Sequence, residues 1–278
     1  MKLASYLERI GYKGPVAATL DCLTQVHRRQ AFTIPYENLD VQLGRPLDFD
    51  TQRIFEKMVV RRRGGWCYEI HQILLWALKE IGFDAMLVTA GIYRHEKGDT
   101  MLGNHTAILV NLDQQTYLAD LGLGDGIRDP IPLREGTYQQ GSLSFRLERV
   151  DDGYWRFHNH ELGYPNKFDF QQEPADRQTL VDHSQHLQTS DESIFVQNLV
   201  CQIMQPASVT CLTGRVLRHK LPSGTTKSVI SADEFEPTIA TVFGIRDAEL
   251  ATLWPQVEAR HELLFGSKSA DEINFQGF

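Results

Sequence analysis

A cysteine stands at the start of a long apolar helix pattern, directly after two glycines and a tryptophan. In RGGWCYEIHQILLWALKEIG, which covers residues 63–82, apolar residues recur at three- and four-residue steps from Cys67 to Ile81. This spacing predicts a helix with one apolar face, and Gly82 is a suitable C-terminal stop. Cys67 then falls in the first turn, where unpaired N–H groups and the helix dipole favour a thiolate.

A cysteine in this setting is suited to nucleophilic chemistry. A free thiol has a pKa of about 8.5, and a helix N-terminus or a neighbouring imidazolium lowers it by several units. Gly64 and Gly65 allow the chain to turn tightly just before the helix. The alternative is a structural role, because buried cysteine commonly behaves as a small hydrophobic residue. A base within reach of the thiol would favour the nucleophile.

One histidine and one aspartate stand where they can supply that base. His105 opens the strand pattern HTAILVNL, and Asp120 lies in the next strand pattern, YLADLG. A hairpin with a two-residue loop at 113–114 would put His105 and Asp120 on the same face as diagonal neighbours, about 7–8 Å apart at the backbone. A slip of one residue would put them on opposite faces, and Asp120 would then be a turn residue only.

Composition limits the classes of function. The 278 residues carry a net charge of −8, which argues against a nucleic-acid or anionic-membrane partner. Met1–Leu20 is interrupted by charges and a proline, so we expect neither a secretory signal nor a membrane span. The cysteines show no metal-ligand or dithiol spacing, and few cysteines in a long chain predict a reducing, cytoplasmic location without a bound metal. They are Cys22, Cys67, Cys201 and Cys211.

The periodicity of apolar residues divides the chain into three parts. Residues up to 82 are mostly helical in pattern, whereas the period shortens to two from about Ala85. Residues 193–204 and 209–221 are predicted as a further pair of strands, and helical patterns return after Ser231. This segregated order predicts an α+β protein. We expect a helical bundle at 1–84, a sheet or barrel at 85–190 and an α/β lid at 191–278.

Several separated motifs resemble the arylamine N-acetyltransferases and extend over most of the chain. They are IPYENLD at 34–40, RGGWC at 63–67, YLADLGLG at 117–124, HLQTSDESIFVQNLVC at 186–201 and VFGI at 242–245. The resemblance implies a helical bundle, a β-barrel and an α/β lid, with a Cys-His-Asp triad like that of cysteine proteases. In this sequence the triad falls on Cys67, His105 and Asp120.

The resemblance also implies a reaction. The Cys67 thiolate would take the acetyl group of acetyl-coenzyme A and pass it to an arylamine, arylhydrazine or N-hydroxyarylamine, with ping-pong kinetics. His105 would act as the base, and Asp120 would orient its imidazole. Such an activity belongs to the metabolism of xenobiotics. The sequence sets no oligomeric state.

Further residues receive roles by the same resemblance. Ile92, Leu123 and Phe195 would line the acceptor pocket, although each also fits a core position. Leu123 replaces the family's usual phenylalanine, which makes smaller or aliphatic acceptors possible. Glu37 and Arg63 would form an ion pair that supports the site; unrelated surface charges are the alternative.

Two further features lie near the triad. His71 replaces the usual asparagine four residues after the nucleophile, and we expect it to form a supporting hydrogen bond, with a competing base as the alternative. Gly124 and Gly126 offer backbone N–H groups to coenzyme A. Asp125 between them would repel a phosphate, which argues against a role of these glycines in binding the pyrophosphate of coenzyme A.

Other functions use the same residues. An amide synthase of the same family would act on a carrier-bound acyl chain. A cysteine protease or transglutaminase-like enzyme would need an open groove, against which a closing C-terminal lid argues. A binding protein on this scaffold would have an inert site, which the intact Cys67, His105 and Asp120 disfavour. Acetylation of Cys67 by acetyl-coenzyme A separates the first interpretation from these.

Overall fold

Helices of the N-terminal part surround the helix that begins at Cys67. The computed structural model describes residues 1–150 and 152–273. Thr19 caps α2 by accepting a hydrogen bond from the N–H of Cys22, and Asp50 caps α4 in the same way. The helical segments of this part are α1 (Leu3–Arg9), α2 (Leu20–Thr33), α3 (Leu39–Gln42), α4 (Thr51–Phe55), η1 (Glu56–Val60) and α5 (Cys67–Ile81).

The middle of the chain forms a sheet that curls into a nearly closed barrel. Among the described residues it has eight strands, in the order β5-β4-β3-β2-β9-β8-β7-β6. The short α6 (Arg94–Lys97) and η2 (Asp99–Met101) connect β2 to β3. The strands are β2 (Asp84–Ile92), β3 (His105–Leu112), β4 (Gln115–Ala119), β5 (Ile131–Pro132), β6 (Gly136–Gln140), β7 (Leu143–Arg149), β8 (Trp155–His158) and β9 (Lys167–Pro174).

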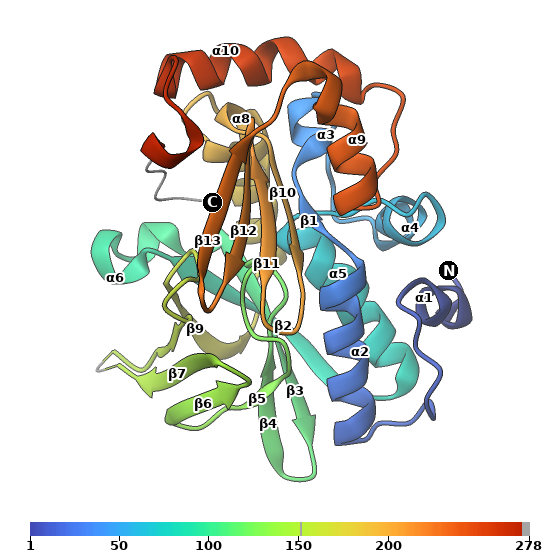
Figure 1. Cartoon of the computed structure of the whole chain (residues 1–278). Coiled ribbons are helices and arrows are strands. Elements are labelled where there is room, and N and C mark those ends of the chain that lie inside the picture. The colour runs from blue at the N-terminus through green and yellow to red at the C-terminus, as the bar shows by residue number, and fades with distance from the viewer. Residues whose placement is uncertain (151, 274–278) are drawn as a thin grey trace.

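The C-terminal part builds a second antiparallel sheet and covers it with helices. In the described part of the chain this sheet has five strands, in the order β1-β10-β11-β12-β13. Figure 1 shows α10 running across the end of the molecule above these strands. Its strands are β1 (Tyr36–Glu37), β10 (Val200–Met204), β11 (Val209–Thr213), β12 (Val216–Leu221) and β13 (Gly224–Val229). The helical segments are α7 (Arg177–Thr189), α8 (Ile194–Gln197), α9 (Ala232–Val242), η3 (Leu250–Leu253), α10 (Trp254–Phe265) and η4 (Ala270–Glu272).

The predicted α+β class and order of elements are correct, with two local corrections. Residues 194–197 are the helix α8 and not a strand, because Ser193 accepts a hydrogen bond from the N–H of Phe195 and starts a helical turn. The second correction concerns β1, which lies in the part predicted as helical. It pairs with β10, so the N-terminal part supplies an edge strand of the C-terminal sheet.

The hairpin of β3 and β4 has the predicted register. Leu112 pairs with Gln115 and Ile108 with Ala119, which places Ala107 opposite Asp120. The two loop residues, Asp113 and Gln114, have φ of 49° and 64°. Positive φ at both positions is the requirement of the tight turn that suits a two-residue hairpin. The hairpin therefore directs His105 and Asp120 to one face.

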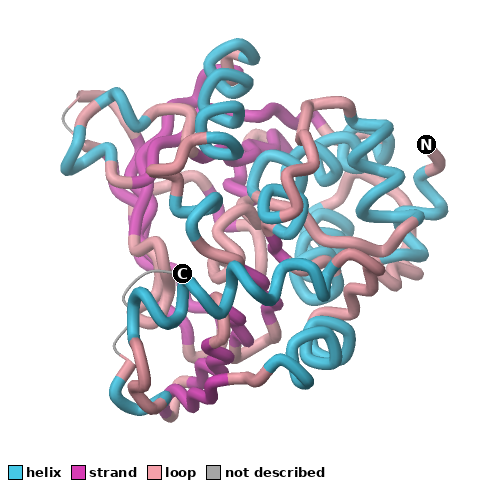
Figure 2. The backbone as a smooth tube through the Cα atoms, turned by 90° about the horizontal axis from the view of Figure 1, so that it is seen from above, coloured by secondary structure: helices cyan, strands magenta, loops and turns pink. Residues whose placement is uncertain are grey.

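In the part of the chain that the structure describes, three hydrophobic clusters fill the spaces between these layers. One joins the N-terminal helices to the facing side of β3 and β4, one fills the barrel, and one lies between the second sheet and the C-terminal helices. In Figure 2 the N-terminal helices gather near the N-terminus, and most strands lie away from it. Within the described residues none of the helices has the length and apolar character that a bilayer-spanning segment needs.

Candidate active site

The segment before α5 fixes the position of Cys67. Gly65 lies beside β1: its N–H donates to Pro35 O at 3.2 Å, and its carbonyl accepts from Glu37 N at 2.9 Å. A Cβ atom on Gly64 would lie 2.2 Å from Pro35 O, so only glycine permits this close approach. Cys67 is the first residue of α5, as the apolar spacing predicts.

The environment of the Cys67 thiol differs from the simple expectation of a lowered pKa. The residue is only 3% exposed, and burial raises the pKa of its thiol, because a thiolate loses hydration there. The backbone N–H groups of Tyr68 and of Cys67 itself act in the opposite direction. The helix N-terminus alone therefore does not ionise this thiol, and a proton acceptor beside it is required.

His105 and Asp120 form the hydrogen-bonded pair that can supply this acceptor. Nε2 of His105 lies 3.2 Å from Oδ2 of Asp120, and both residues are buried. Burial alone would raise the pKa of Asp120, but the neighbouring imidazole of His105 and its hydrogen bond act in the opposite direction, and the pKa lies below its usual value. An ionised Asp120 accepts the Nε2–H of His105 and leaves Nδ1 unprotonated. Among the described side chains, Nδ1 of His105 has no hydrogen-bond partner.

Gly122 shows how closely the parts of the site converge. A Cβ atom at this position would lie 2.9 Å from Cβ of Cys67, 2.9 Å from Cε1 of His105 and 2.5 Å from Cε1 of His71. The cysteine and the two histidines therefore meet around one point of the chain. A side chain at residue 122 would force them apart.

Cys67 and His105 open into a cavity of about 460 Å³. Ile92, Leu123 and Phe195 all line this cavity, as the resemblance implies, although Leu123 and Phe195 are also largely buried. The thiol is thus next to a mostly apolar space of the size that binding sites for small molecules have.

Sequence reasoning missed several residues that line the same cavity. Tyr36 and Tyr164 both face it, as does Tyr93, which follows β2 with a left-handed φ of 64°. The hydroxyl groups of Tyr93 and Tyr164 are hydrogen-bonded to each other across 71 positions of the chain. No local spacing indicates such a pair. The positive φ of a bulky tyrosine is itself visible only in the structure.

Long-range hydrogen bonds hold Phe195 in the cavity wall. The side chain of Asn38 donates to Phe195 O at 2.8 Å, and that of Gln42 donates to the same oxygen at 2.6 Å. The ring of Phe195 packs edge-on against Trp66, with 5.4 Å between ring centroids. Trp66, the residue before Cys67, therefore contacts the wall of the cavity directly.

Glu37 and Arg63 form the expected ion pair, inside a larger network. Nη2 of Arg63 lies 3.0 Å from Glu37 and 3.2 Å from Asp40, and Nη1 lies 2.7 Å from Asp247. Lys57, itself buried, lies 2.8 Å from Asp40 and also pairs with Glu69 in the first turn of α5. Through Arg63 and Asp247 the network joins the segment before Cys67 to the C-terminal part.

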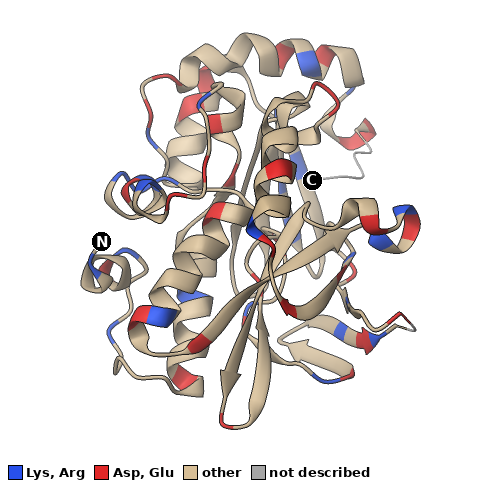
Figure 3. Ribbon diagram, turned by 180° about the vertical axis from the view of Figure 1, so that it is seen from behind, with Lys and Arg blue, Asp and Glu red and all other residues tan. Residues whose placement is uncertain are grey.

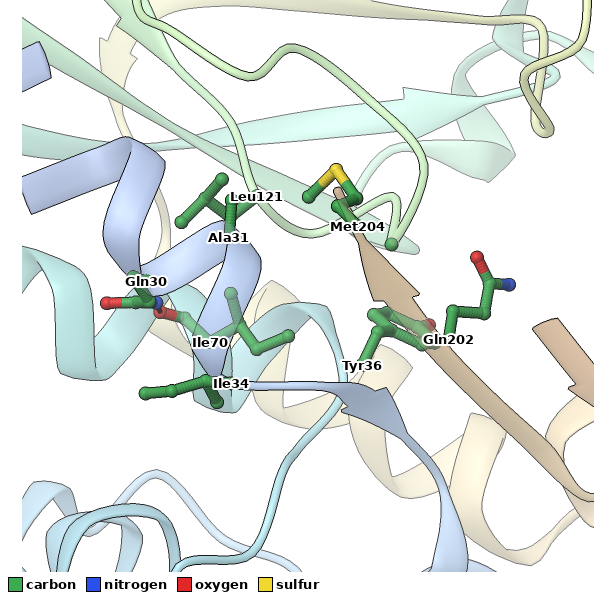
Figure 4. A pocket seen from close by; sticks show the side chains of 9 residues that line it. Gln30, Ala31, Ile34, Tyr36, Ile70, Leu121, Gln202 and Met204 are labelled. Atoms are coloured by element: carbon green, nitrogen blue, oxygen red, sulfur yellow. Dashed lines mark hydrogen bonds between the residues drawn. The ribbon is translucent and has the colours of Figure 1, made fainter. Parts of the chain in front are cut away.

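Neither Gly124 nor Gly126 lines the cavity at Cys67. Gly124 lines a separate internal space of about 10 Å³, together with Tyr36 and Gln202; Figure 4 shows the side chains around it. The charge of Asp125, which we expected to repel a phosphate, is compensated by neighbouring side chains. Asp125 is buried, 2.8 Å from Lys220 and 2.9 Å from His160.

A cysteine at a helix N-terminus and a histidine–carboxylate pair on a barrel define a class of enzymes that use a thiol nucleophile. Comparison with known proteins identifies the family. Residues 19–250 match the family model described as N-acetyltransferase. The chain is 31% identical to arylamine N-acetyltransferase 1 of Bos taurus over 244 residues, which cover 79% of this chain and 83% of the relative. It is 28% identical to human arylamine N-acetyltransferase 1 over 274 residues, 88% of this chain and 94% of the relative.

Solved structures agree with this assignment. The arylamine N-acetyltransferase of Mycobacterium abscessus has a TM-score of 0.83 and 26% identity, with 93% of this chain and 95% of that chain covered. That of Mycobacterium marinum, solved in complex with CoA, has a TM-score of 0.82 and 28% identity, with 93% and 98% covered. The chain belongs to the arylamine N-acetyltransferase family, which confirms the resemblance noted in the sequence.

Proposed function

We propose that this chain transfers an acetyl group from acetyl-coenzyme A to an arylamine, through a thioester on Cys67. The observation that carries the proposal is the shared cavity: Cys67 and His105 open into the same apolar space as Ile92, Leu123 and Phe195. A nucleophile and a base that share an apolar pocket suit a flat, uncharged acceptor. The family's solved complex with CoA supports coenzyme A as the carrier of the acetyl group.

In the first half-reaction, Nδ1 of His105 accepts the thiol proton of Cys67 while the sulfur attacks the thioester carbonyl. The tetrahedral intermediate collapses to acetyl-Cys67, and the proton goes to the departing sulfur of coenzyme A. Asp120 stabilises the imidazolium that forms between these steps. The backbone N–H of Cys67 is a candidate donor to the oxyanion, because N–H groups of the first helical turn lack intrahelical partners.

In the second half-reaction, the amine attacks the acetyl carbon, and His105 accepts the amine proton and returns it to the Cys67 sulfur. The cycle leaves an amide and the free thiol, and no other reactant is consumed. Arylhydrazines and N-hydroxyarylamines offer an equivalent nitrogen nucleophile. Because leucine stands at 123, the acceptor space is wider than a phenyl ring at this position would allow.

A cytoplasmic role in the metabolism of xenobiotic arylamines is the cellular setting that we infer. All four cysteines are free and buried, which suits a reducing compartment. Acidic and basic residues are interspersed along the ribbon in Figure 3 and carry a net charge of −8, which does not favour a nucleic-acid partner.

Initial-rate kinetics test the two-step proposal. The initial rate is measured against the concentration of acetyl-coenzyme A at several fixed concentrations of an aniline. If both half-reactions pass through an acetyl-cysteine intermediate, the double-reciprocal lines are parallel. Lines that intersect would show that both substrates bind before any chemistry. That result would contradict the proposal.

A further inference from the structure

His71 is surrounded by polar groups that belong to the hairpin carrying the other site residues. Its side chain is completely buried. Nδ1 lies 2.8 Å from Oγ1 of Thr106, and Nε2 lies 3.1 Å from both Leu121 N and Gly122 N. Nε2 is also 3.0 Å from Oδ1 of Asp120. One imidazole on α5 thus contacts β3 and the segment that follows β4.

The backbone groups decide where the proton of His71 lies. An amide N–H is a fixed donor, whereas the hydroxyl of Thr106 can donate or accept. Two amide groups directed at Nε2 require that this nitrogen accepts, so Nδ1 carries the proton and donates it to Thr106. Burial lowers the pKa of His71, which favours the neutral ring that this hydrogen-bond pattern requires, while Asp120 acts in the opposite direction. Gly122 N–H is then shared between Nε2 and Oδ1 of Asp120, which lies 2.7 Å away.

We propose that His71 is a positioning residue whose unprotonated Nε2 holds the segment 120–122 in place. Asp120 is then kept within hydrogen-bond distance of His105, and the backbone of Gly122 is kept in contact with Cys67. Because the N–H groups of Leu121 and Gly122 are bonded to Nε2, the chain cannot rotate the carboxylate of Asp120 away from His105. The same bonds keep the backbone of Gly122 in the narrow space between the three side chains.

This assignment removes His71 as a competing base. Both of its ring nitrogens are engaged, Nδ1 as a donor and Nε2 as an acceptor, so neither is available to a proton on the Cys67 sulfur. His71 therefore acts on the thiol only through Asp120, His105 and Gly122. The inference rests on the proposed role of Cys67 as the nucleophile.

Alkylation of Cys67 by iodoacetamide tests the inference without acetyl-coenzyme A or an acceptor. His71→Leu removes the acceptor but keeps the volume, whereas His71→Gln places an amide oxygen near the position of Nε2. We expect the leucine variant to react with iodoacetamide about tenfold more slowly or worse, since it leaves a buried N–H group unpaired. The glutamine variant should remain within about threefold of the wild type. His261→Gln, at a buried histidine of α10, is the matched control and should not change the rate.

A leucine variant that folds and reacts at the wild-type rate would overturn the inference, as would a glutamine variant as slow as the leucine variant. Nitrogen NMR of the wild-type protein adds a readout that needs neither variant to be active. The signal of His71, identified by its loss in His71→Gln, should show a protonated Nδ1 and an unprotonated Nε2. The opposite tautomer would contradict the proposal even if the leucine variant does not fold. A Cys67 thiol no more reactive than the other cysteines would count against the proposed function instead.

Discussion

Asp120 makes more contacts than it would need in order to orient His105 alone. Its two carboxylate oxygens serve different partners: Oδ2 faces His105, while Oδ1 accepts from Gly122 N–H and lies beside His71. The negative charge is held by hydrogen bonds in a site where burial alone would favour the neutral acid. At the scale of single residues, the site thus depends on a charge that its neighbours stabilise.

Asp120→Asn is expected to lower turnover by about four orders of magnitude, as loss of the orienting carboxylate does in other triads. The amide cannot stabilise an imidazolium at His105. The measurement is kcat with acetyl-coenzyme A and an aniline, together with circular dichroism to establish folding. A variant that keeps about a tenth of the wild-type turnover or more would show that Asp120 does not serve the base.

Leu123→Phe is expected to change the preference for acceptors and to leave acylation of Cys67 nearly unchanged. The added ring would line the cavity and stack on an aryl acceptor, and an aromatic pair contributes about 0.5–1.5 kcal/mol. This corresponds to a change of roughly 2- to 13-fold in kcat/KM for that acceptor. Acylation and transfer rates are measured separately, with one aryl and one alkyl acceptor. Equal effects on both acceptors, or on both steps, would assign Leu123 to the core alone.

At the scale of elements, the β3–β4 hairpin and the start of α5 have to meet at Gly122. The hairpin was predictable from sequence, because a two-residue loop fixes the register and alternation fixes the face of His105 and Asp120. The start of α5 was predictable from the apolar period. The contact between them was not, since it depends on a glycine whose neighbours lie 17 or more positions away.

The helix α8 and the strand β1 could not be predicted from the sequence. Residues 194–197 are rich in apolar and β-branched types, which favours a strand, but Asn38 and Gln42 bind the backbone of a helical turn there. β1 has two residues, too few to show a period. The division at 84 and 190 stays a prediction, and β1 shows that the first part supplies a strand to the sheet of the third.

Gly122→Ala tests the meeting of these elements. The new methyl group would lie within 2.9 Å of Cys67 and His105, and closer still to His71, so the side chains must shift. Activity should fall roughly tenfold or more, because strain from overpacking costs about 1–3 kcal/mol. Gly126→Ala is the matched control: its methyl group would meet Leu123 at 3.5 Å, an ordinary contact. Equal activity of the two variants would contradict the predicted convergence.

At the scale of the whole molecule, buried charges connect parts that are distant in sequence. Asp247 follows α9 and lies 2.7 Å from Arg63 and 2.6 Å from Arg45. Arg63 is nearly inaccessible to solvent, so removing a carboxylate leaves a buried cation with less compensation. These ion pairs connect the C-terminal helices to the segment that leads to Cys67.

Asp247→Asn should therefore lower the free energy of unfolding by about 1–3 kcal/mol. Urea unfolding gives the value. Glu258→Gln, an exposed carboxylate on α10, makes the same chemical change and should stay within about 0.5 kcal/mol of the wild type. If the two variants are equally stable, the ion pairs of Asp247 do not contribute to the free energy of unfolding.

Stability should also fall on mild acidification because of His27. Burial lowers its pKa from 6.5 to about 4. Above about pH 6.5 the ring is neutral in both states; between about 6.5 and 4 only the unfolded chain takes up the proton, so the free energy of unfolding decreases as the pH falls. Below about pH 4 both states are protonated and the loss is constant.

Protonation of His27 alone should lower the free energy of unfolding by about 2 kcal/mol between about pH 7.5 and about pH 5. The decrease is roughly 1.4 kcal/mol per pH unit below 6.5. His27→Asn keeps a donor for Arg128 O, the partner of Nδ1, but cannot be protonated. Urea unfolding of both proteins at the two pH values should give a pH dependence smaller by about this amount in the variant. An unchanged pH dependence would show that His27 is not the group that titrates.

The proposed function requires that Cys67 carries the acetyl group between two substrates. Mass spectrometry of the intact protein, after mixing with acetyl-coenzyme A in the absence of an acceptor, tests it most directly. We predict a gain of one acetyl group that maps to the peptide containing Cys67, that is absent from a folded Cys67→Ala variant and that disappears when an aniline is added. A wild-type protein that gains no acetyl group, or one whose acetyl group maps to another residue or survives the acceptor, would contradict the account.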